Sequence, residues 1–299
     1  MLRVIPPLTV TDAMVVSLSE SETDAAAWSS GTTYAAAAQV VYAHRIYESL
    51  QASNTNHQPD LAASSTWWLD TGPTNAWAMF DGAVNTATVA STDDITVVLA
   101  PTTRIDTIAL VEVSGASVSC VVTKDGATIY SNSQYVAAGT SSSWYEWFFG
   151  ERGTTGDVVF EGIPPYTGQQ ITITVTGASV AQVGVLVMGR IYEIGTVELG
   201  AEVSIADYST KVTDAFGTTT LSQGAYARRP SYPLLVDRSQ FARVFRLLES
   251  LRATPCLWLA STEYDTLGPI NAFGWYRDFR AVIPYRDYIR STLEIEGLI

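Results

Sequence analysis

Alternation of apolar and small polar side chains, in short segments between residues 95 and 176, constrains the fold of this chain more than any other feature. The segments that show it span residues 95–99, 105–113, 118–123 and 171–176. A period of two residues places one set of side chains on a buried face and the other toward water, as in a β-strand. Asp125-Gly126 predicts a tight turn between two of these segments. We therefore expect an antiparallel β-sandwich over residues 70–199.

The last third of the chain follows a different pattern. Between Arg238 and Arg252, apolar residues recur at helical spacing, and Asp237 or Ser239 could cap the start of such a helix. We expect the helix to bury one face in its own domain, with the residues Phe241, Val244, Phe245 and Leu248. Segments 255–260, 274–284 and 290–299 read as strands, so residues 200–299 are expected to form a small α+β domain.

Two further segments precede the sandwich. Residues 1–27, stiffened by Pro6-Pro7, are expected to form an extended N-terminal arm. Residues 28–69 are rich in aromatic side chains and in turn-forming Gly, Asn and Pro, and are expected to form a small module. The predicted fold class is thus mainly β: an antiparallel sandwich with a small aromatic-rich module before it and an α+β domain after it.

Charge is distributed unevenly between these parts. Residues 200–299 hold 11 basic and 11 acidic residues, which leaves 6 of the 17 basic and 19 of the 30 acidic residues in the first two thirds. So acidic a surface repels nucleic acid and anionic membranes, and we expect neither as a partner. Cys120 and Cys256 fit neither a disulfide framework nor a zinc site, and are expected to be buried free thiols. The N-terminal sequence lacks the pattern of a signal peptide.

Motifs for catalysis and cofactor binding are lacking. His44 and His57 are the only histidines, and the chain has no HExxH, GxSxG or Walker A pattern. Acidic pairs such as Asp93-Asp94 are typical of solvated loops or of calcium ligands in an acidic domain, and no defined calcium-loop spacing is present. We predict that the protein is not an enzyme and that it has no catalytic residue, metal ligand or cofactor.

Aromatic residues offer the clearest candidates for binding. Trp67 and Trp68 end the small module, and Trp144 and Trp147 belong to an aromatic run within the predicted sandwich. An indole face can stack on the apolar face of a sugar ring, so all four are candidate carbohydrate-binding residues. The alternative is that large rings supply the core of a module too small to build one from aliphatic residues. That alternative is favoured for Trp67 and Trp68.

Two segments resemble known carbohydrate-binding folds. The pattern Trp28…Tyr34, Val40-Val-Tyr42 and Tyr47 resembles the small chitin- and cellulose-binding module, although His44 stands where that family has glycine. Asn75–Gly82 and the hairpin 121–130 are similar to the galactose-binding-like, discoidin-type jelly roll. The resemblances imply a jelly roll over residues 70–199 and a related sugar-binding scaffold over residues 28–69.

Nearly the whole chain resembles a set of tailed-bacteriophage structural proteins. The segments that carry this resemblance are Gly72–Asp81, Pro255–Trp258, Gly274–Phe279 and Leu293–Leu298. It implies a non-enzymatic component of the distal tail or baseplate, made in the host cytoplasm and built into the virion. The partners would be other tail proteins, copies of itself in a threefold or sixfold ring, and host-surface polysaccharide.

Assembly contacts are expected in the N-terminal arm of residues 1–27 and at arginine residues of the last third of the chain. Arg favours buried interfaces because its planar guanidinium makes several hydrogen bonds per charge. The candidates are Arg228, Arg229, Arg238, Arg243 and Arg246. A solvated basic helix face is the plainer alternative for these residues. A freestanding carbohydrate-binding module from a secreted polysaccharide-degrading system is the alternative function for the whole chain.

Overall fold

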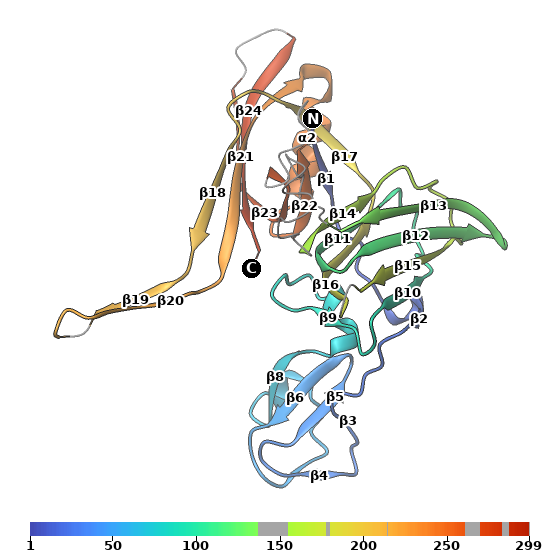
Figure 1. The fold of residues 1–299 in the computed structure, drawn as a ribbon, viewed down its shortest axis with the longest axis vertical. Coiled ribbons are helices and arrows are strands. Elements are labelled where there is room, and N and C mark those ends of the chain that lie inside the picture. Colours follow the sequence, from blue (N-terminus) through green and yellow to red (C-terminus); the bar gives the residue numbers. More distant parts are fainter. Residues whose placement is uncertain (137–154, 178–179, 214, 261–269, 283–286, 299) are drawn as a thin grey trace, which may run out of the picture. The chain divides into compact units, whose positions relative to one another are not determined.

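The computed structural model describes residues 1–136, 155–177, 180–213, 215–260, 270–282 and 287–298. The chain is mainly β, as expected, and its sheets are predominantly antiparallel (Figure 1). It divides into two compact units. The barrel unit comprises residues 1–8, 104–108 and 187–299, and the two-sheet unit comprises residues 9–103 and 109–186.

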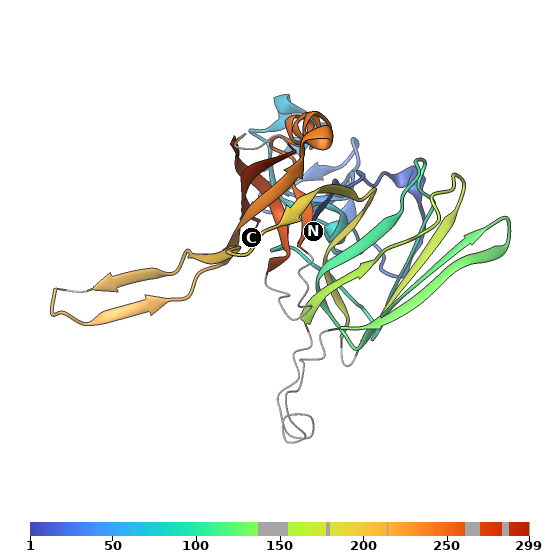
Figure 2. The ribbon, with the colours of Figure 1, turned by 90° about the horizontal axis from the view of Figure 1, so that it is seen from above.

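Two sheets of the two-sheet unit form two layers (Figure 2). The larger sheet has the order β13 (Ala127–Tyr135), β12 (Ser117–Lys124), β15 (Gln170–Thr176), β10 (Ile95–Leu99) and β2 (Val15–Leu18). The smaller sheet has the order β14 (Thr155–Phe160), β11 (Thr107–Ser114), β16 (Gln182–Gly189) and β9 (Thr88–Val89).

Period-two alternation correctly predicted the burial of three strands in the larger sheet, β10, β12 and β15. It was wrong for the segment 105–113, because β11 of the smaller sheet is buried at five consecutive residues, Thr107–Val111. In β10, Ile95, Val97 and Leu99 are buried, and the residues between them are partly exposed. The strands β12 and β15 alternate in the same way. Asp125 and Gly126 both have positive φ in the turn between β12 and β13, which confirms the predicted hairpin.

The small module is built from short strands within the two-sheet unit. One sheet has the order β3 (Ala26–Ala27), β5 (Gln39–Tyr42), β6 (Arg45–Ser49) and β8 (Trp68–Pro73), and β4 (Thr33–Tyr34) pairs with β7 (Asn54–Thr55). The module also holds the short 3-10 helix η2 (Ala62–Ser64), and two more 3-10 helices flank it, η1 (Asp12–Met14) before it and η3 (Asn75–Phe80) after it. We refer to residues 26–73 as the small module.

The barrel unit is a ring of strands that closes on itself. The sheet order is β17 (Tyr192–Val197), β1 (Leu2–Ile5), β22 (Cys256–Ala260), β23 (Ala272–Val282), β24 (Tyr288–Gly297), β21 (Tyr226–Asp237) and β18 (Glu202–Asp207). The strand β21 is long enough to pair with β18 near its start and with β17 near its end, which closes the ring. At Gly274 an added Cβ would lie 2.2 Å from the backbone oxygen of Glu296, so the close approach of the paired strands β23 and β24 requires glycine here.

Residues 1–27 do not form the separate arm that the sequence suggested. Leu2–Ile5 is strand β1, held between β17 and β22, and Val15–Leu18 is strand β2 at the edge of the larger sheet. The C-terminal unit likewise begins near residue 187 rather than at residue 200. The reason is that a central strand with both neighbours paired contributes more buried surface than a free arm.

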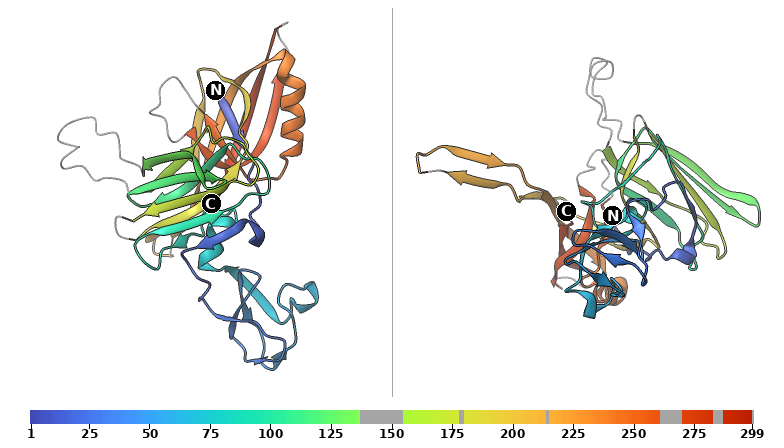
Figure 3. Two further views of the ribbon diagram at one scale, coloured as in Figure 1. Left: turned by 90° about the vertical axis from the view of Figure 1, so that its right-hand side faces the viewer. Right: turned by 90° about the horizontal axis from the view of Figure 1, so that it is seen from below.

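Helix α2 (Arg238–Ser250) confirms the predicted helix and its cap (Figure 3). The Asp237 carboxylate accepts hydrogen bonds from the backbone N–H and the hydroxyl of Ser239, at 2.7 and 2.6 Å. Val244 and Leu248 are buried as expected. The prediction for Phe245 was wrong: its side chain is 42% exposed, and its ring centroid lies 5.9 Å from that of Phe241 and 6.3 Å from that of Phe279.

The core of the barrel unit is centred on Trp258 and Tyr232. The Trp258 indole is fully buried and donates a hydrogen bond to the backbone oxygen of Gly274 at 2.9 Å. The Tyr232 hydroxyl donates to the backbone oxygen of Ile270, and burial raises the pKa of Tyr232. Around them pack apolar residues from strands far apart in the chain, among them Leu2, Ile194, Leu234 and Leu293.

Candidate functional site

The tryptophans of the small module are mainly core residues. Trp68 is 4% exposed and forms the module's core with Val40 and Tyr47. Its indole N–H donates to the backbone oxygen of His57 at 2.8 Å, so the polar edge is also satisfied. Trp68 therefore offers no open ring face to a sugar, in agreement with the favoured prediction that rings supply this core.

Trp67 is the more accessible of the two candidate platforms. Its side chain is partly buried, and the His57 imidazole stacks on it with ring centroids 3.9 Å apart and planes 12° apart. His57 is fixed in turn by a 2.9 Å contact between its Nδ1 and the Asn54 amide oxygen. Trp67 is thus a rigid, partly covered ring. Trp144 and Trp147 lie outside the described residues.

The candidate assembly arginines are distributed over two elements of the barrel unit. Arg228 and Arg229 lie on β21, whereas Arg238, Arg243 and Arg246 lie on α2. The Arg229 guanidinium pairs with Glu296, and this hydrogen bond raises the pKa of Arg229. Arg243 donates to Gln240 at 3.0 Å and to the backbone oxygen of Glu193 at 3.2 Å. Arg229 and Arg243 therefore stabilise their own unit, and Arg246 lies on the exposed face of α2.

A β-hairpin that the sequence analysis did not single out is the most exposed element of the barrel unit. Strands β19 (Thr210–Thr213) and β20 (Thr219–Ser222) pair with each other and have no buried residue. In Figure 2 this hairpin extends away from the sheet of its own unit. From here on, the arm means this hairpin of residues 210–222 and not the N-terminal segment. Val212 and Leu221 are 66% and 73% exposed, and Lys211 is the only charged residue in the two strands.

The arm leaves the sheet through a well-defined root. The Asp207 carboxylate accepts from the N–H and hydroxyl of Ser209, and these hydrogen bonds lower the pKa of Asp207. The Ser209 hydroxyl oxygen accepts from the Gly224 N–H at 3.0 Å. An added Cβ at Gly224 would lie 2.5 Å from the backbone oxygen of Tyr208, so the two backbone segments of the root approach as closely as glycine allows. The root fixes the direction in which the arm emerges.

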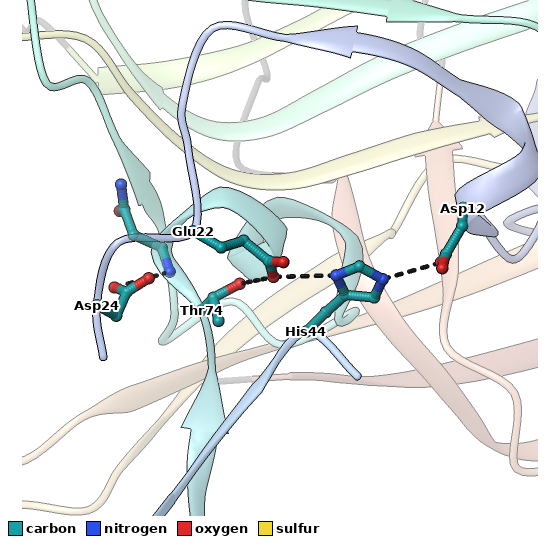
Figure 4. A network of polar contacts seen from close by, with 6 residues as sticks. Asp12, Glu22, Asp24, His44 and Thr74 are labelled. Atoms are coloured by element: carbon teal, nitrogen blue, oxygen red, sulfur yellow. Dashed lines mark hydrogen bonds and ion pairs between the residues drawn. The ribbon is translucent and has the colours of Figure 1, made fainter. Parts of the chain in front are cut away.

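A polar cluster joins the small module to the rest of the two-sheet unit (Figure 4). The two ring nitrogens of His44 lie 2.9 Å from carboxylate oxygens, Nδ1 from Glu22 and Nε2 from Asp12. The Thr74 hydroxyl donates to the same Glu22 oxygen at 2.7 Å. Asp24 accepts from the Asn75 backbone N–H at 3.2 Å. Segments before and after the module thus converge on one histidine.

The two cysteine thiols of the chain are buried. Cys120 and Cys256 are buried free thiols, as predicted, and desolvation raises the pKa of each to about 12. Within the described ranges, no group of three or more His, Cys, Asp or Glu side chains is arranged to hold a metal ion. Among the same residues, no helix has the length and apolar character needed to cross a membrane.

Comparisons with known proteins do not assign a family. A scan against protein-family models found no match, and searches of curated proteins and of solved structures found no significant similarity.

Proposed function

We propose that this protein is a structural subunit of a bacteriophage tail, placed in a ring near the distal tail or baseplate. The barrel unit would make the contacts between subunits, and the two-sheet unit would lie at the periphery. The observation that carries the proposal is the arm. A β-hairpin with no buried residue gains little from its own chain, since an isolated two-stranded hairpin is at best marginally stable in water.

The composition of the arm and of its neighbouring strand favours a protein partner. The strand β18 is the last strand of the barrel sheet, and its side chains include exposed Val203 and Ile205. Open edges of this kind are usually blunted by charge or proline, yet the arm strands carry Thr, Val and Leu with the single charge of Lys211. A second copy of the chain fits best, because a contact between an arm and a different surface of the next copy repeats around a closed ring.

The two-sheet unit would be the outward part of this ring. We propose that its two antiparallel sheets are the jelly roll of the galactose-binding-like resemblance, and that the small module contacts host polysaccharide weakly. Trp67 is the ring of the module that can supply such a contact, because Trp68 is core. Stacking on one ring provides about 1–2 kcal/mol, so useful avidity would require many copies held together.

Removing the arm tests the proposal. In the shortened chain, residues 210–222 are replaced by Asn-Gly, which closes a tight turn and keeps the root at Ser209 and Gly224. We expect the full chain to form a closed oligomer by native mass spectrometry and sedimentation velocity, and the shortened chain to remain a folded monomer. A full chain that is monomeric and binds polysaccharide on its own would support the alternative, a freestanding carbohydrate-binding module.

A further inference from the structure

The turn that carries His44 is conformationally costly. It joins β5 to β6 by two residues, Ala43 and His44, with φ values of 48° and 64°. Positive φ at both central positions is the pattern of a type I′ turn, in which Asn-Gly or Gly-Gly is preferred. A side chain kept at such a position indicates that the surrounding structure requires it.

The His44 ring is held on one face and at both nitrogens. It stacks on Trp77 of η3 with ring centroids 3.7 Å apart and planes 17° apart. Its two nitrogens face the carboxylates of Asp12 and Glu22, each at 2.9 Å. The backbone oxygen of His44 also accepts from the Thr74 N–H at 2.9 Å. His44 is therefore the point at which the tip of a small-module hairpin contacts η1, η3 and the segments on both sides of the module.

The donors and acceptors around the His44 ring decide which protonation state fits this site. A neutral imidazole donates from one nitrogen only, and its other nitrogen has a lone pair. Against two ionised carboxylates, that lone pair would face an acceptor oxygen and repel it. The imidazolium form donates from both nitrogens and makes two charge-assisted hydrogen bonds. Between two ionised carboxylates, the contact is complete only when His44 is protonated.

We propose that protonated His44 is a latch that fixes the small module against the rest of the two-sheet unit and that the latch opens when His44 loses its proton. The proposal does not depend on the tail assignment. Because the two carboxylates hold the cationic form of His44, loss of the His44 proton as pH rises weakens the latch. The latch would make the orientation of the module depend on pH.

Other charged groups near the junction have partners of their own. The Arg45 guanidinium, next in the chain, pairs with Asp70 at 2.6 Å, and this hydrogen bond raises the pKa of Arg45. The Asp81 carboxylate accepts from the Ala83 N–H and the Thr86 hydroxyl, each at 2.7 Å. Asp24 accepts from the Asn75 N–H. The carboxylates that face the two His44 nitrogens are therefore those of Asp12 and Glu22.

Nuclear magnetic resonance of the full chain tests the latch. Amide relaxation gives the rotational correlation time of the small module and of the two sheets, measured at fixed ionic strength from about pH 5 to 9, the range in which histidine usually titrates. Imidazole nitrogen shifts follow the protonation of His44 in the same samples. We expect one shared correlation time while His44 is protonated and a shorter time for the module after it loses its proton, reversibly.

Three variants make the result decisive. His44→Gln should give the shorter module correlation time at every pH, and His57→Gln, which changes the other histidine of the chain, should respond as the wild type does. If His44→Gln loses the amide dispersion of the folded module, Glu22→Gln serves in its place and should shift the transition toward lower pH. The proposal is overturned if the wild-type correlation times stay equal after His44 has lost its proton, or if a folded His44→Gln chain keeps one shared time.

Discussion

Replacing Leu221 by Asp in the arm should weaken self-association and leave the folded monomer intact. Leu221 is 73% exposed in the single chain, and fully burying a leucine stabilises by about 1.5–3 kcal/mol. A neighbour that covers the exposed part therefore gains about 1–2 kcal/mol from this side chain at each contact. A carboxylate at the same place loses that gain and adds the cost of desolvating a charge. We expect the assembly midpoint to move to at least about tenfold higher protein concentration.

Sedimentation velocity over a dilution series measures this shift, with Leu61→Asp as the matched control. Leu61 is 51% exposed and lies in the small module, so it provides the same chemical change away from the arm. Both variants should unfold within about 0.5 kcal/mol of the wild type, since neither change removes a buried contact. The reasoning is refuted if Leu221→Asp assembles at the wild-type concentration, or if Leu61→Asp weakens assembly to the same extent.

Three further predictions concern the barrel unit and the thiols. Trp258→Ala should lower the free energy of unfolding by about 3–5 kcal/mol in denaturant titrations, whereas Trp275→Ala should lower it clearly less, because the Trp275 side chain is already 36% exposed in the folded chain. At about pH 8, iodoacetamide should leave the native protein unmodified and alkylate both cysteines only after unfolding, as intact mass will show, because burial raises each thiol pKa to about 12. The hydrogen bonds from Ser239 lower the pKa of Asp237 in the folded chain. The stabilisation from its carboxylate is therefore present above the pKa of the unfolded state and is lost as pH falls through the folded pKa. In Asp237→Asn the amide oxygen can still cap the helix, so thermal melts of this variant should no longer show this pH dependence.

Local patterns predicted the parts of the fold that local physics determines. Residues 95–99 alternate because β10 has one face on the core, and the strand was predicted with its correct bounds. The helix beginning at Arg238 was predicted because its cap and its apolar spacing are both local signals. Phe245 was misplaced because the spacing gives the apolar face of a helix but not how far the underlying sheet extends.

Long-range pairing was not predictable in the same way. The segment Leu2–Ile5 is only four residues long, too short for a reliable pattern, and it pairs with β17 and β22, whose residues follow it by more than 180 positions. Nothing within the first 27 residues indicates those partners. Similarly, the two carboxylates on His44 come from 22 and 32 residues earlier in the chain, so no spacing rule links them to it. The departure from glycine at His44 was visible in the sequence, but its reason required the contacts.

The arm and the His44 turn have one physical feature in common: each departs from a local rule without compensation inside its own element. The arm pairs β-forming residues but buries none of them, and the turn places two side chains at positive φ. Such departures persist where a partner outside the element makes them favourable. For His44 the partners are the carboxylates of Asp12 and Glu22 and the indole of Trp77, all of which contact its ring. For the arm, no described residue of the same chain covers the strands, and this is the reason for our proposal that a second copy of the chain covers them.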